Sequence, residues 1–401
     1  MNILAITHVF PNAVEPHAGV FNLQQLKALS EQGISIRVIA PVPWYPCQAL
    51  AGRWAEFSET SRVPEREDID GLPTWHPRYR FTPRVFRSLY PWFYATSIAP
   101  VFSRLISELP PALILTTWAF PDAGGAARLA RKSGLPYAVK VHGSDIYDHC
   151  QHANRRRNIQ RTLHGARTII AVSAALGQAV VELGIPPRKV HIVANGVDVD
   201  HFTPGDRNLA RNSLNLPADV PLVVQVGTLK HVKGPDVLLS AFGILLEDER
   251  FAHAHLVLAG AGPLRAVLKE QAARLGIGPR VHFLGILPHR DVRNCYRSAD
   301  VVVCASRSEG TPNAVLEALA CGRPVVATAV GGIPAILEQS APECLVPPED
   351  PRSLAAAMSR CLLAPGPDSR WRNIVSGRSW RVGAQCLAPI LRAAASPPAD
   401  F

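Results

Sequence analysis

The chain has 401 residues, of which 47% are hydrophobic and 18% charged, and its formal net charge is +10. This length suits two domains better than a single core. No apolar run reaches the roughly 18 residues that a membrane span requires, which argues against an integral membrane protein.

The first half of the chain alternates strand patterns with helix patterns. We expect strands at residues 3–6, 35–40, 113–116, 137–141, 168–173 and 190–193. Helices are expected at residues 21–32, 123–132, 155–164 and 176–183. Such alternation is typical of a parallel sheet whose strands are joined by crossover helices.

The alternation stops at residues 194–207, ANGVDVDHFTPGDR, which we interpret as a linker, and it then restarts. The second set of strands is expected at 222–226, 256–259, 281–284, 301–304 and 324–327. The second set of helices is expected at 234–246, 264–275, 291–298, 314–320 and 333–338.

These patterns predict an α/β protein with two doubly wound, Rossmann-like domains that face each other across a cleft. We place an N-terminal acceptor-binding domain at 1–200 and a C-terminal nucleotide-sugar-binding domain at 201–375. A C-terminal helix at 376–394 is expected to cross back to the N-terminal domain, followed by a disordered tail at 395–401.

The positive charge lies mainly in the first half, where residues 1–190 hold 21 Lys and Arg against 13 Asp and Glu. Within it, segment 75–105 combines arginines with aromatic residues. Its arginines include Arg78, Arg80, Arg84 and Arg87. Such a segment either docks on an anionic membrane surface or packs as an ordinary amphipathic helix on its own domain. No nucleic-acid motif accompanies it, so we expect no nucleic-acid partner.

The eight cysteines are scattered, and no two of them form a C-x-x-C pair. We therefore expect free thiols in a reducing compartment rather than disulfides or metal ligands. The start of the chain, MNILAITHVF, enters an apolar strand directly and has no charged leader. We expect a cytoplasmic protein, with peripheral contact at the inner face of the plasma membrane through its basic half.

Two carboxylates, Glu309 and Glu317, lie within the otherwise small, apolar or turn-forming segment SEGTPNAVLEALACG, residues 308–322. Thr311 and Pro312 predict a helix start, with the hydroxyl as N-cap and the proline at the first helical position. Glu309 then lies in a loop at the carboxyl end of a strand, and Glu317 lies within the next helix.

The first N–H groups of this helix, at Asn313, Ala314 and Val315, predict an anion site at the end of the sheet where ligands bind. An anion site between two carboxylates suits a nucleotide sugar, with Glu317 on the ribose and Glu309 on the sugar hydroxyls. The alternative is that both acids are ordinary solvated residues.

Three further stretches predict ligand contacts. In VKVHGSDIYD, residues 139–148, His142 follows a strand and is either a site residue or a hydrogen-bonded structural histidine. Lys230 and Lys233 lie at a strand-to-helix turn, where an ammonium group meets phosphates or is simply solvated. Gly19 directly precedes the first helix, where the backbone can approach a pyrophosphate.

In order and spacing, these stretches together resemble the family 4 retaining glycosyltransferases with the GT-B fold. The motifs that carry the resemblance are HGSD at 142–145, NGVD at 195–198, KG at 233–234, GAGP at 260–263, the run from Glu309 to Glu317, and CGRPVVATAVGGIPAIL at 321–337. The first half also resembles the branch that builds bacterial cell-surface polymers such as teichuronic acid.

The resemblance implies a role for several residues. It assigns His142 and Glu309 to catalysis beside the transferred sugar, Glu317 to the ribose, and Lys233 to the charge of the leaving diphosphate. It implies donor contacts by Gly19, Thr228, Lys230, Gly310, Thr311 and Asn313, and by the amides of Val315 and Leu316. We predict acceptor contacts by Arg78, Arg80 and Asp145.

Two departures from the family pattern stand out. Many relatives carry an arginine directly after the glycine that matches Gly227, where this chain has Thr228, so Lys230 or the helix amides would have to replace that cation. Relatives also often have a Gly-Gly pair in the first loop, where this chain has Ala18-Gly19.

These observations predict a metal-independent, retaining glycosyltransferase that needs no cofactor. It would move a hexose or N-acetylhexosamine from a nucleotide sugar, a UDP-sugar before a GDP-sugar, to a lipid-linked or polysaccharide acceptor. The alternatives are a sugar-nucleotide epimerase of similar fold and a non-catalytic sugar-nucleotide-binding protein. A dinucleotide-dependent oxidoreductase is disfavoured because no G-x-G-x-x-G follows the first strand.

Overall fold

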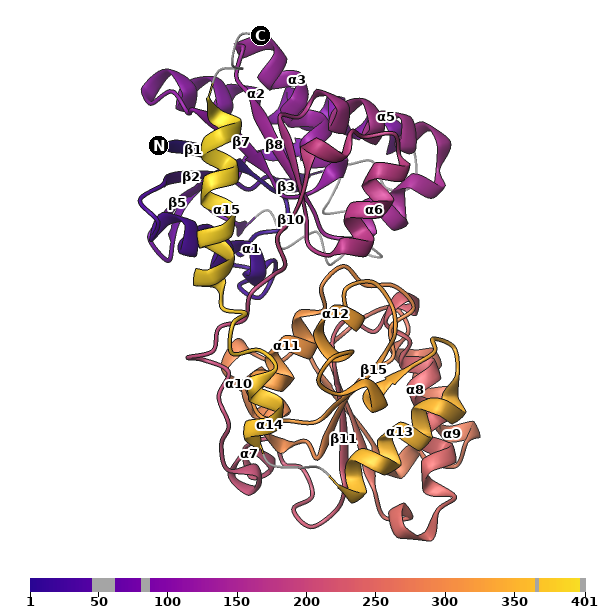
Figure 1. Ribbon diagram of the computed structural model, residues 1–401. Helices are drawn as coiled ribbons and strands as arrows, with labels where there is room; N and C mark the ends of the chain where they lie inside the picture. The colour runs from indigo at the N-terminus through magenta and orange to yellow at the C-terminus, as the bar shows by residue number, and fades with distance from the viewer. Residues whose placement is uncertain (45–61, 81–86, 365–367, 397–401) are drawn as a thin grey trace. The chain divides into compact units, whose positions relative to one another are not determined.

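The computed structural model describes residues 1–44, 62–80, 87–364 and 368–396 (Figure 1). The chain divides into two compact units. Unit 1 comprises Met1–Asn195 and Trp380–Phe401, and unit 2 comprises Gly196–Ser379. The chain thus passes between units after Asn195 and after Ser379, where the sequence placed boundaries after residues 200 and 375.

In its described part, unit 1 is built on an eight-stranded sheet with the order β10-β9-β8-β7-β1-β2-β5-β4. Its strands are β1 (Asn2–Ile6), β2 (Ser35–Ile39), β4 (Arg66–Ile69), β5 (Leu72–Trp75), β7 (Leu113–Thr116), β8 (Tyr137–Val141), β9 (Thr168–Ala171) and β10 (Val190–Ile192). Neighbouring strands pair in parallel except β4, which is antiparallel to β5. The sequence pattern missed β4 and β5, as well as the separate pair β3 (Val42–Trp44) and β6 (Arg78–Arg80), because these strands are only three or four residues long.

Helices cover the sheet of unit 1. They are α1 (Val20–Ser30), α2 (Tyr90–Glu108), α3 (Gly124–Ser133), α4 (Ser144–Tyr147), α5 (Ala153–Gly165), α6 (Ala174–Glu182) and α15 (Trp380–Ala395). Strands β7, β8 and β9 are buried at every residue. A parallel sheet that is covered on both faces buries its strands along their whole length. This burial explains why the sequences of these strands are apolar runs.

The C-terminal helix α15 belongs to unit 1 and lies against α1 (Figure 1). Its buried residues Leu387 and Leu391 share one apolar cluster with Leu26 and Leu29 of α1. This helix therefore contributes to the core around β1 and β2. The tail that we predicted to be disordered lies, from residue 397 on, outside the described residues.

Unit 2 contains, within its described residues, a six-stranded parallel sheet with the order β13-β12-β11-β14-β15-β16. Its strands are β11 (Leu222–Val226), β12 (His255–Ala259), β13 (Val281–Gly285), β14 (Val301–Cys304), β15 (Val325–Thr328) and β16 (Leu345–Val346). Its helices are α7 (Arg207–Ser213), α8 (Pro235–Leu246), α9 (Arg265–Arg274), α10 (His289–Ser298), α11 (Asn313–Ala320), α12 (Pro334–Leu337), α13 (Pro351–Leu363) and α14 (Asp368–Asn373).

Both sheets contain a point at which the strand order reverses. In unit 1, β1 has β2 on one side and β7 on the other, so the chain winds one way after β1 and the opposite way after β7. In unit 2, β11 lies between β12 and β14 in the same manner. Open α/β sheets bind ligands outside the carboxyl ends of the strands at this point, so the loops after β1, β7, β11 and β14 are the places to search for a site.

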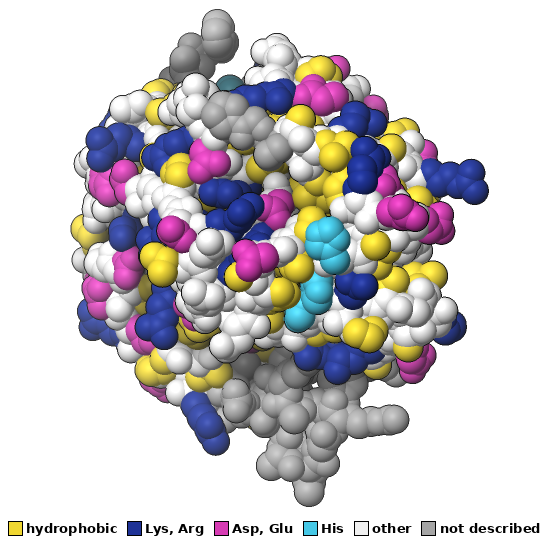
Figure 2. Space-filling model, turned by 90° about the horizontal axis from the view of Figure 1, so that it is seen from below, with side chains coloured by type: hydrophobic (Ala, Val, Ile, Leu, Met, Phe, Trp, Pro, Cys, Tyr) yellow, Lys and Arg dark blue, Asp and Glu magenta, His cyan; other side chains and the backbone are white. Residues whose placement is uncertain are grey.

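Within segment 75–105, the helix α2 packs on unit 1 along one face. The side chains of Tyr94, Ile98 and Phe102 on α2 are buried in unit 1, whereas Trp92 is 48% exposed. Arg84 and the side chain of Arg87 lie outside the described residues. None of the described helices is both long and apolar enough to cross a bilayer. One face of the molecule carries basic and acidic side chains interspersed rather than in a patch of one sign (Figure 2).

We predict that Leu391→Ala destabilises unit 1, because Leu391 is fully buried under α1. Truncating a buried leucine costs about 2–5 kcal/mol. Denaturant unfolding of the full chain would measure the loss, with Val382→Ala, on an exposed position of the same helix, as the control. Equal stability of the two variants would contradict the assignment of α15 to this core.

Candidate active site

The loops after β11 and β14 bring two predicted site residues into contact in unit 2. Lys233 Nζ lies 2.6 Å from Glu309 Oε1, although the two residues are 76 positions apart in the sequence. The Glu309 side chain is 8% exposed and that of Lys233 is 31% exposed. The pair therefore has a buried acid beneath a lysine that reaches solvent.

Burial alone would lower the pKa of Lys233, but the charge of Glu309, the nearby Cys304 and the hydrogen bond to Glu309 together raise it. Glu309 Oε1 also accepts a hydrogen bond from Ser306 Oγ at 2.7 Å. The Lys233 ammonium group is therefore charged at neutral pH. It is held in place by Glu309, whose side chain is itself fixed by the hydrogen bond from Ser306. This geometry gives unit 2 a fixed cation at its switch point.

Close backbone contact between the two loops makes the pair possible. Gly234 follows Lys233 with φ 58°, and a Cβ at this position would lie 2.0 Å from the carbonyl oxygen of Ala305. Only glycine tolerates both the left-handed conformation and this approach. The Lys-Gly dipeptide therefore places the lysine where Glu309 can reach it.

Arg307 holds the same two loops together and was missed by the sequence analysis. Its guanidinium donates to both carboxylate oxygens of Asp236, at 2.8 and 2.7 Å, and also contacts Glu349. Its backbone N–H donates to the carbonyl of Val232 at 2.8 Å. The hydrogen bonds to Asp236 and Glu349 outweigh burial and raise the pKa of Arg307. Because its donors are engaged by these acids, Arg307 does not supply the cation that Thr228 lacks.

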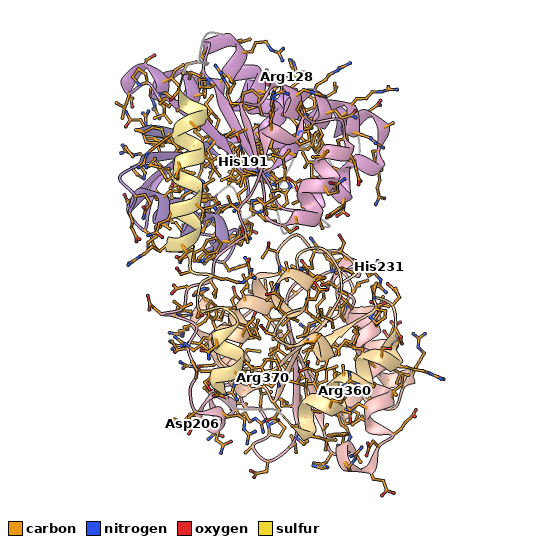
Figure 3. All side chains as sticks on the ribbon, in the orientation of Figure 1. Arg128, His191, Asp206, His231, Arg360 and Arg370 are labelled. Carbon is orange, nitrogen blue, oxygen red and sulfur yellow. The ribbon has the colours of Figure 1, made fainter. Side chains whose placement is uncertain are left out.

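Thr228 and Lys230 both lie on the exposed surface of the turn after β11, which His231 marks in Figure 3. The N–H of Lys230 donates to the carbonyl of Thr228 at 2.8 Å, which fixes the backbone of the turn. The Lys230 side chain is thus near the expected donor site but outside the buried contact that Lys233 makes.

Glu317 lies on α11, where Tyr296 from α10 donates a hydrogen bond to its Oε2 at 2.8 Å. Burial raises the pKa of Glu317 to about 7, and the hydrogen bond from Tyr296 opposes this rise only in part. Tyr296 is fully buried and was not predicted as a site residue. The acid expected to hold a ribose is therefore oriented by a phenol, and its pKa is raised by burial.

The start of α11 differs from the prediction. Pro312 is the N-cap, and the helix begins at Asn313, so Thr311 lies outside it. The N–H groups of Val315 and Leu316 donate to the carbonyl of Pro312, at 3.1 and 3.4 Å. These two amides thus take part in the first turn of the helix, and their expected contact with a pyrophosphate stays a prediction.

Gly310 connects this region to the loop after β15. Its carbonyl accepts a hydrogen bond from the N–H of Gly332 at 2.9 Å. The glycine pair of the segment AVGGIP therefore holds the loop that contains Glu309. This contact is a structural role for the motif at 321–337.

In unit 1, His142 follows β8 and lies among aromatic rings. Trp118 stacks on it with ring centroids 5.2 Å apart and an interplanar angle of 20°, and Phe21 lies at 5.0 Å. Burial, and then the charge of Lys140, lower the pKa of His142 well below its usual value. Its Nε2 is buried and has no hydrogen-bond partner among the described residues. His142 is therefore a neutral imidazole at physiological pH.

Asp145 was expected to contact the acceptor, and the structure assigns it a different role. Its side chain is fully buried, and its Oδ1 accepts from the N–H groups of His142 and Gly143, at 3.0 and 2.8 Å. Its Oδ2 accepts from the N–H of Ala119 at 3.0 Å. A carboxylate so engaged positions the loops after β7 and β8 and cannot reach an acceptor.

Gly19 is the N-cap of α1 and has φ 64°. A Cβ at this position would lie 2.2 Å from the carbonyl oxygen of Val9. The glycine is therefore required by the loop after β1 itself, whether or not a ligand approaches it.

The two predicted arginines of unit 1 have different surroundings. Arg80 is exposed, whereas the Arg78 guanidinium donates to the carbonyls of His76 and Val63. Arg78 also lines a cavity of about 570 Å³ whose other basic residues are Arg37, Arg66 and Arg104. Arg104 belongs to segment 75–105, whereas sequence analysis missed Arg37 and Arg66 because they come from β2 and β4.

We predict that Glu317→Gln stabilises unit 2 at pH 8 but not at pH 4. The pKa of this acid rises from 4.5 to about 7 on folding, so the fold favours the protonated form, and a penalty develops as the pH rises through this window. A neutral amide removes a penalty of about 1–3 kcal/mol at pH 8. Melting curves at both pH values would measure it, with the exposed Glu338→Gln as the control. A stabilisation that is equal at pH 4 and pH 8 would contradict burial as the cause.

Two family profiles match the chain. The profile described as "Glycosyl transferase 4-like domain" matches residues 18–196, and "Glycosyl transferases group 1" matches residues 220–363. The first corresponds to unit 1 and the second to the sheet and site of unit 2.

Individual proteins agree with these profiles. The teichuronic acid biosynthesis glycosyltransferase TuaC of Bacillus subtilis (strain 168) is 30% identical over 367 residues, which cover 90% of this chain and 89% of TuaC. A D-inositol 3-phosphate glycosyltransferase of Geodermatophilus obscurus is 39% identical over 194 residues, 47% of this chain and 43% of that protein.

Solved structures share the fold over the whole chain. The sucrose-phosphate synthase of Thermosynechococcus elongatus aligns with a TM-score of 0.77 and 21% identity, covering 99% of this chain and all of that one. HepE of Anabaena, in complex with UDP-glucose, aligns with a TM-score of 0.72 and 20% identity, covering 98% and 100%. Since TuaC is similar along nearly its whole length and the fold agrees, the chain belongs to the group 1, family 4-type glycosyltransferases of the GT-B fold.

Proposed function

We propose that this glycosyltransferase moves a hexose or N-acetylhexosamine from a nucleotide diphosphate sugar, with retention of configuration, to a lipid-linked or polysaccharide acceptor in cell-surface glycan synthesis. A UDP-sugar is the first choice of donor, because the fold neighbour HepE was solved with UDP-glucose. The acceptor class follows from the similarity to TuaC, whose name assigns it to teichuronic acid biosynthesis.

The contact between Lys233 and Glu309 carries this proposal. Departure of a nucleoside diphosphate leaves negative charge on its oxygens, and a preorganised cation at that place stabilises the transition state. Lys233 is such a cation, and it lies at the switch point where open α/β sheets bind nucleotides. In this scheme Glu309, whose Oε1 faces the ammonium, accepts hydrogen bonds from the donor sugar.

In this scheme, Glu317 and His142 have separate roles. Glu317 accepts hydrogen bonds from the ribose while Tyr296 holds it in place. His142, kept neutral by burial, offers a hydrogen bond beside the sugar without introducing a charge that would compete with Lys233. No step in this scheme requires a metal ion.

The basic residues of unit 1 would meet an anionic acceptor or a membrane surface. The cavity is lined by four arginines, Arg37, Arg66, Arg78 and Arg104, against two acids, Glu65 and Glu108, and has room for a phosphate group. Arg80, close in sequence to Arg78, is exposed. We therefore propose peripheral contact with the inner face of the plasma membrane. The cavity walls also include Trp75 and Val101, which suit an amphiphilic acceptor.

Two other functions compete with transfer. A sugar-nucleotide epimerase would release a free epimerised sugar, and a non-catalytic binding protein would bind the donor without turnover. Membership of the glycosyltransferase family and the intact Lys233–Glu309 pair both favour transfer.

The test has two stages. A thermal-shift screen of UDP, GDP, ADP and their sugars identifies the donor, because a ligand of the folded state raises the melting temperature. Transfer from that donor to octyl glycosides is then followed by NMR, which reads the anomeric configuration of the product. An α-linked product from an α-linked donor is expected, and Glu309→Gln should lower its rate strongly. An inverted product would overturn the retaining assignment, and a free epimerised sugar would favour the epimerase.

We predict that Lys233→Ala weakens nucleoside diphosphate binding by about 10- to 150-fold, since a charge-assisted contact contributes about 1.5–3 kcal/mol. Lys230→Ala is the matched control, because its side chain is exposed on the same turn. Isothermal titration with UDP in the presence of chelator would compare the two variants with the parent. Parental affinity in Lys233→Ala would show that the phosphate site lies elsewhere, and loss of binding in the parent with chelator would refute the metal-free scheme.

We also predict salt-sensitive binding to vesicles that contain anionic lipid. Each basic residue near such a surface contributes about 1 kcal/mol. Exchange of the exposed Arg66, Arg80 and Arg104 for Glu should therefore weaken flotation with these vesicles by about 100-fold or more at low salt. Arg274→Glu, an exposed change in unit 2, is the control. Binding that is equal in all variants, or equal at low and high salt, would contradict the prediction.

A further inference from the structure

A second acid–base pair lies in unit 1, outside the residues discussed above. Nδ1 of His8 lies 2.9 Å from both carboxylate oxygens of Asp122, and the backbone N–H of His8 donates to Oδ2 of the same acid at 3.1 Å. Asp122 is fully buried, whereas the His8 side chain is 27% exposed. Three contacts to one buried carboxylate fix both the position and the ring orientation of His8.

The pair lies at the switch point of unit 1. His8 lies two residues after the end of β1, and Asp122 lies in the turn Ala119–Ala123 that follows β7, the neighbour of β1 in the sheet. This is where an open α/β sheet binds its ligand. The pair therefore occupies in unit 1 the place that Lys233 and Glu309 occupy in unit 2.

The surroundings of His8 leave one ring nitrogen available. Because the carboxylate of Asp122 accepts from Nδ1–H, the neutral ring carries its lone pair on Nε2. Within the described part of the chain, Nε2 has no hydrogen-bond partner. Trp118 lies edge-on to His8 at 6.0 Å and stacks on His142 with its face. The Trp118 ring thus connects His8 to the histidine proposed to lie beside the donor sugar.

Resting on the proposed glycosyl transfer, we propose that His8 is the catalytic base that binds the attacking hydroxyl of the acceptor, and that Asp122 is its positioning residue. The acceptor is accordingly an alcohol, a sugar or polyol hydroxyl, that donates its hydrogen bond to Nε2 of His8. Asp122 does not touch the acceptor and acts only through the imidazole.

The hydroxyl oxygen forms a bond to the anomeric carbon on the face from which the diphosphate departs, so that the configuration is retained. The bond from that carbon to the diphosphate oxygen breaks, and its electron pair stays on the diphosphate. The hydroxyl proton moves to Nε2 of His8, and the resulting imidazolium is stabilised by the negative charge of Asp122. The proton is later released to water. A retaining transfer also allows the departing diphosphate to take this proton, so the competing assignment is the diphosphate as base.

The charged groups around His8 raise the pKa of its imidazole, which makes the ring a better proton acceptor. Burial lowers the pKa of His8, but the charge of Asp122, its hydrogen bond and the charge of Asp145 raise it overall. The other titratable groups nearby are the hydroxyls of Tyr79 and Tyr94 behind Asp122, and His142 across Trp118. Since a base must be unprotonated, activity should fall on the acid side as His8 becomes protonated.

The first experiment follows kcat/KM against pH in the full chain, with UDP-glucose as donor and octyl β-glucoside as acceptor. We expect His8→Ala to lower kcat by about 10²- to 10⁴-fold while UDP affinity in titration calorimetry stays unchanged. Added imidazole should restore part of this loss, which a merely structural role would not allow. Asp122→Asn should move the acid limb of the profile to lower pH, because the pKa of His8 falls when the negative charge is removed.

The matched control is His191→Gln. This histidine lies on β10, is labelled in Figure 3 and forms no ion pair with a carboxylate among the described residues. It should leave the rate and the pH profile unchanged. Circular dichroism of all three variants checks that the fold is retained.

A second measurement is independent of the substrates. NMR titration of the chain with labelled histidine should show His8 titrating above its ordinary value, and Asp122→Asn should lower that value. A parent-like rate and pH profile in His8→Ala would overturn the inference and favour the diphosphate as base. A His8 that titrates identically in parent and Asp122→Asn would overturn it too. If the parent transfers no sugar and binds no nucleotide, the proposed function fails and this inference fails with it, while an intact His8 titration would show that the pair itself exists.

Discussion

The 2.6 Å contact between Lys233 and Glu309 is the interaction on which the organisation of unit 2 depends. To form it, two loops that are far apart in the sequence must approach until their backbones touch at Gly234 and Ala305. Arg307 secures the approach by bonding from one loop to Asp236 at the start of α8. A cation at the switch point of a parallel sheet is thereby fixed before any diphosphate arrives, so little reorganisation is needed when charge develops on a leaving group.

Unit 1 repeats this arrangement with different residues. Asp122 is buried beneath the partly exposed His8, just as Glu309 is buried beneath the partly exposed Lys233. In both units the acid follows the strand on one side of the switch point, and the base follows the strand on the other. The chemical difference matters, since a lysine serves as a permanent cation for phosphate whereas a histidine can accept and release a proton near neutral pH.

Buried polar groups next to His142 influence whether this histidine is charged. Lys140, fully buried in β8, donates to Gln25 Oε1 at 2.6 Å and Asn195 Oδ1 at 2.8 Å, and burial lowers its pKa to about 7. Its charge helps to keep His142 neutral, while Asp145 orders the backbone around that histidine through three N–H groups. These residues stabilise the loop after β8 and leave recognition of substrates to the side chains above them.

The sequence by itself determined the strand–helix alternation, the two Rossmann-like sheets and the positions of Lys233, Glu309, Glu317 and His142 at strand or helix ends, because these features follow from periodicity, glycine turns and local motifs. Only the tertiary structure decided which of these side chains meet. His8 and Asp122 are separated by 114 residues and Tyr296 and Glu317 by 21, and no local pattern encodes such pairs. For the same reason the local motif did not reveal that Asp145 is covered by the loop after β7, or that the amides of Val315 and Leu316 bond to the Pro312 carbonyl. Whether a polar group faces a ligand or the protein depends on packing between segments that are distant in the chain, and that packing exists only in the folded molecule.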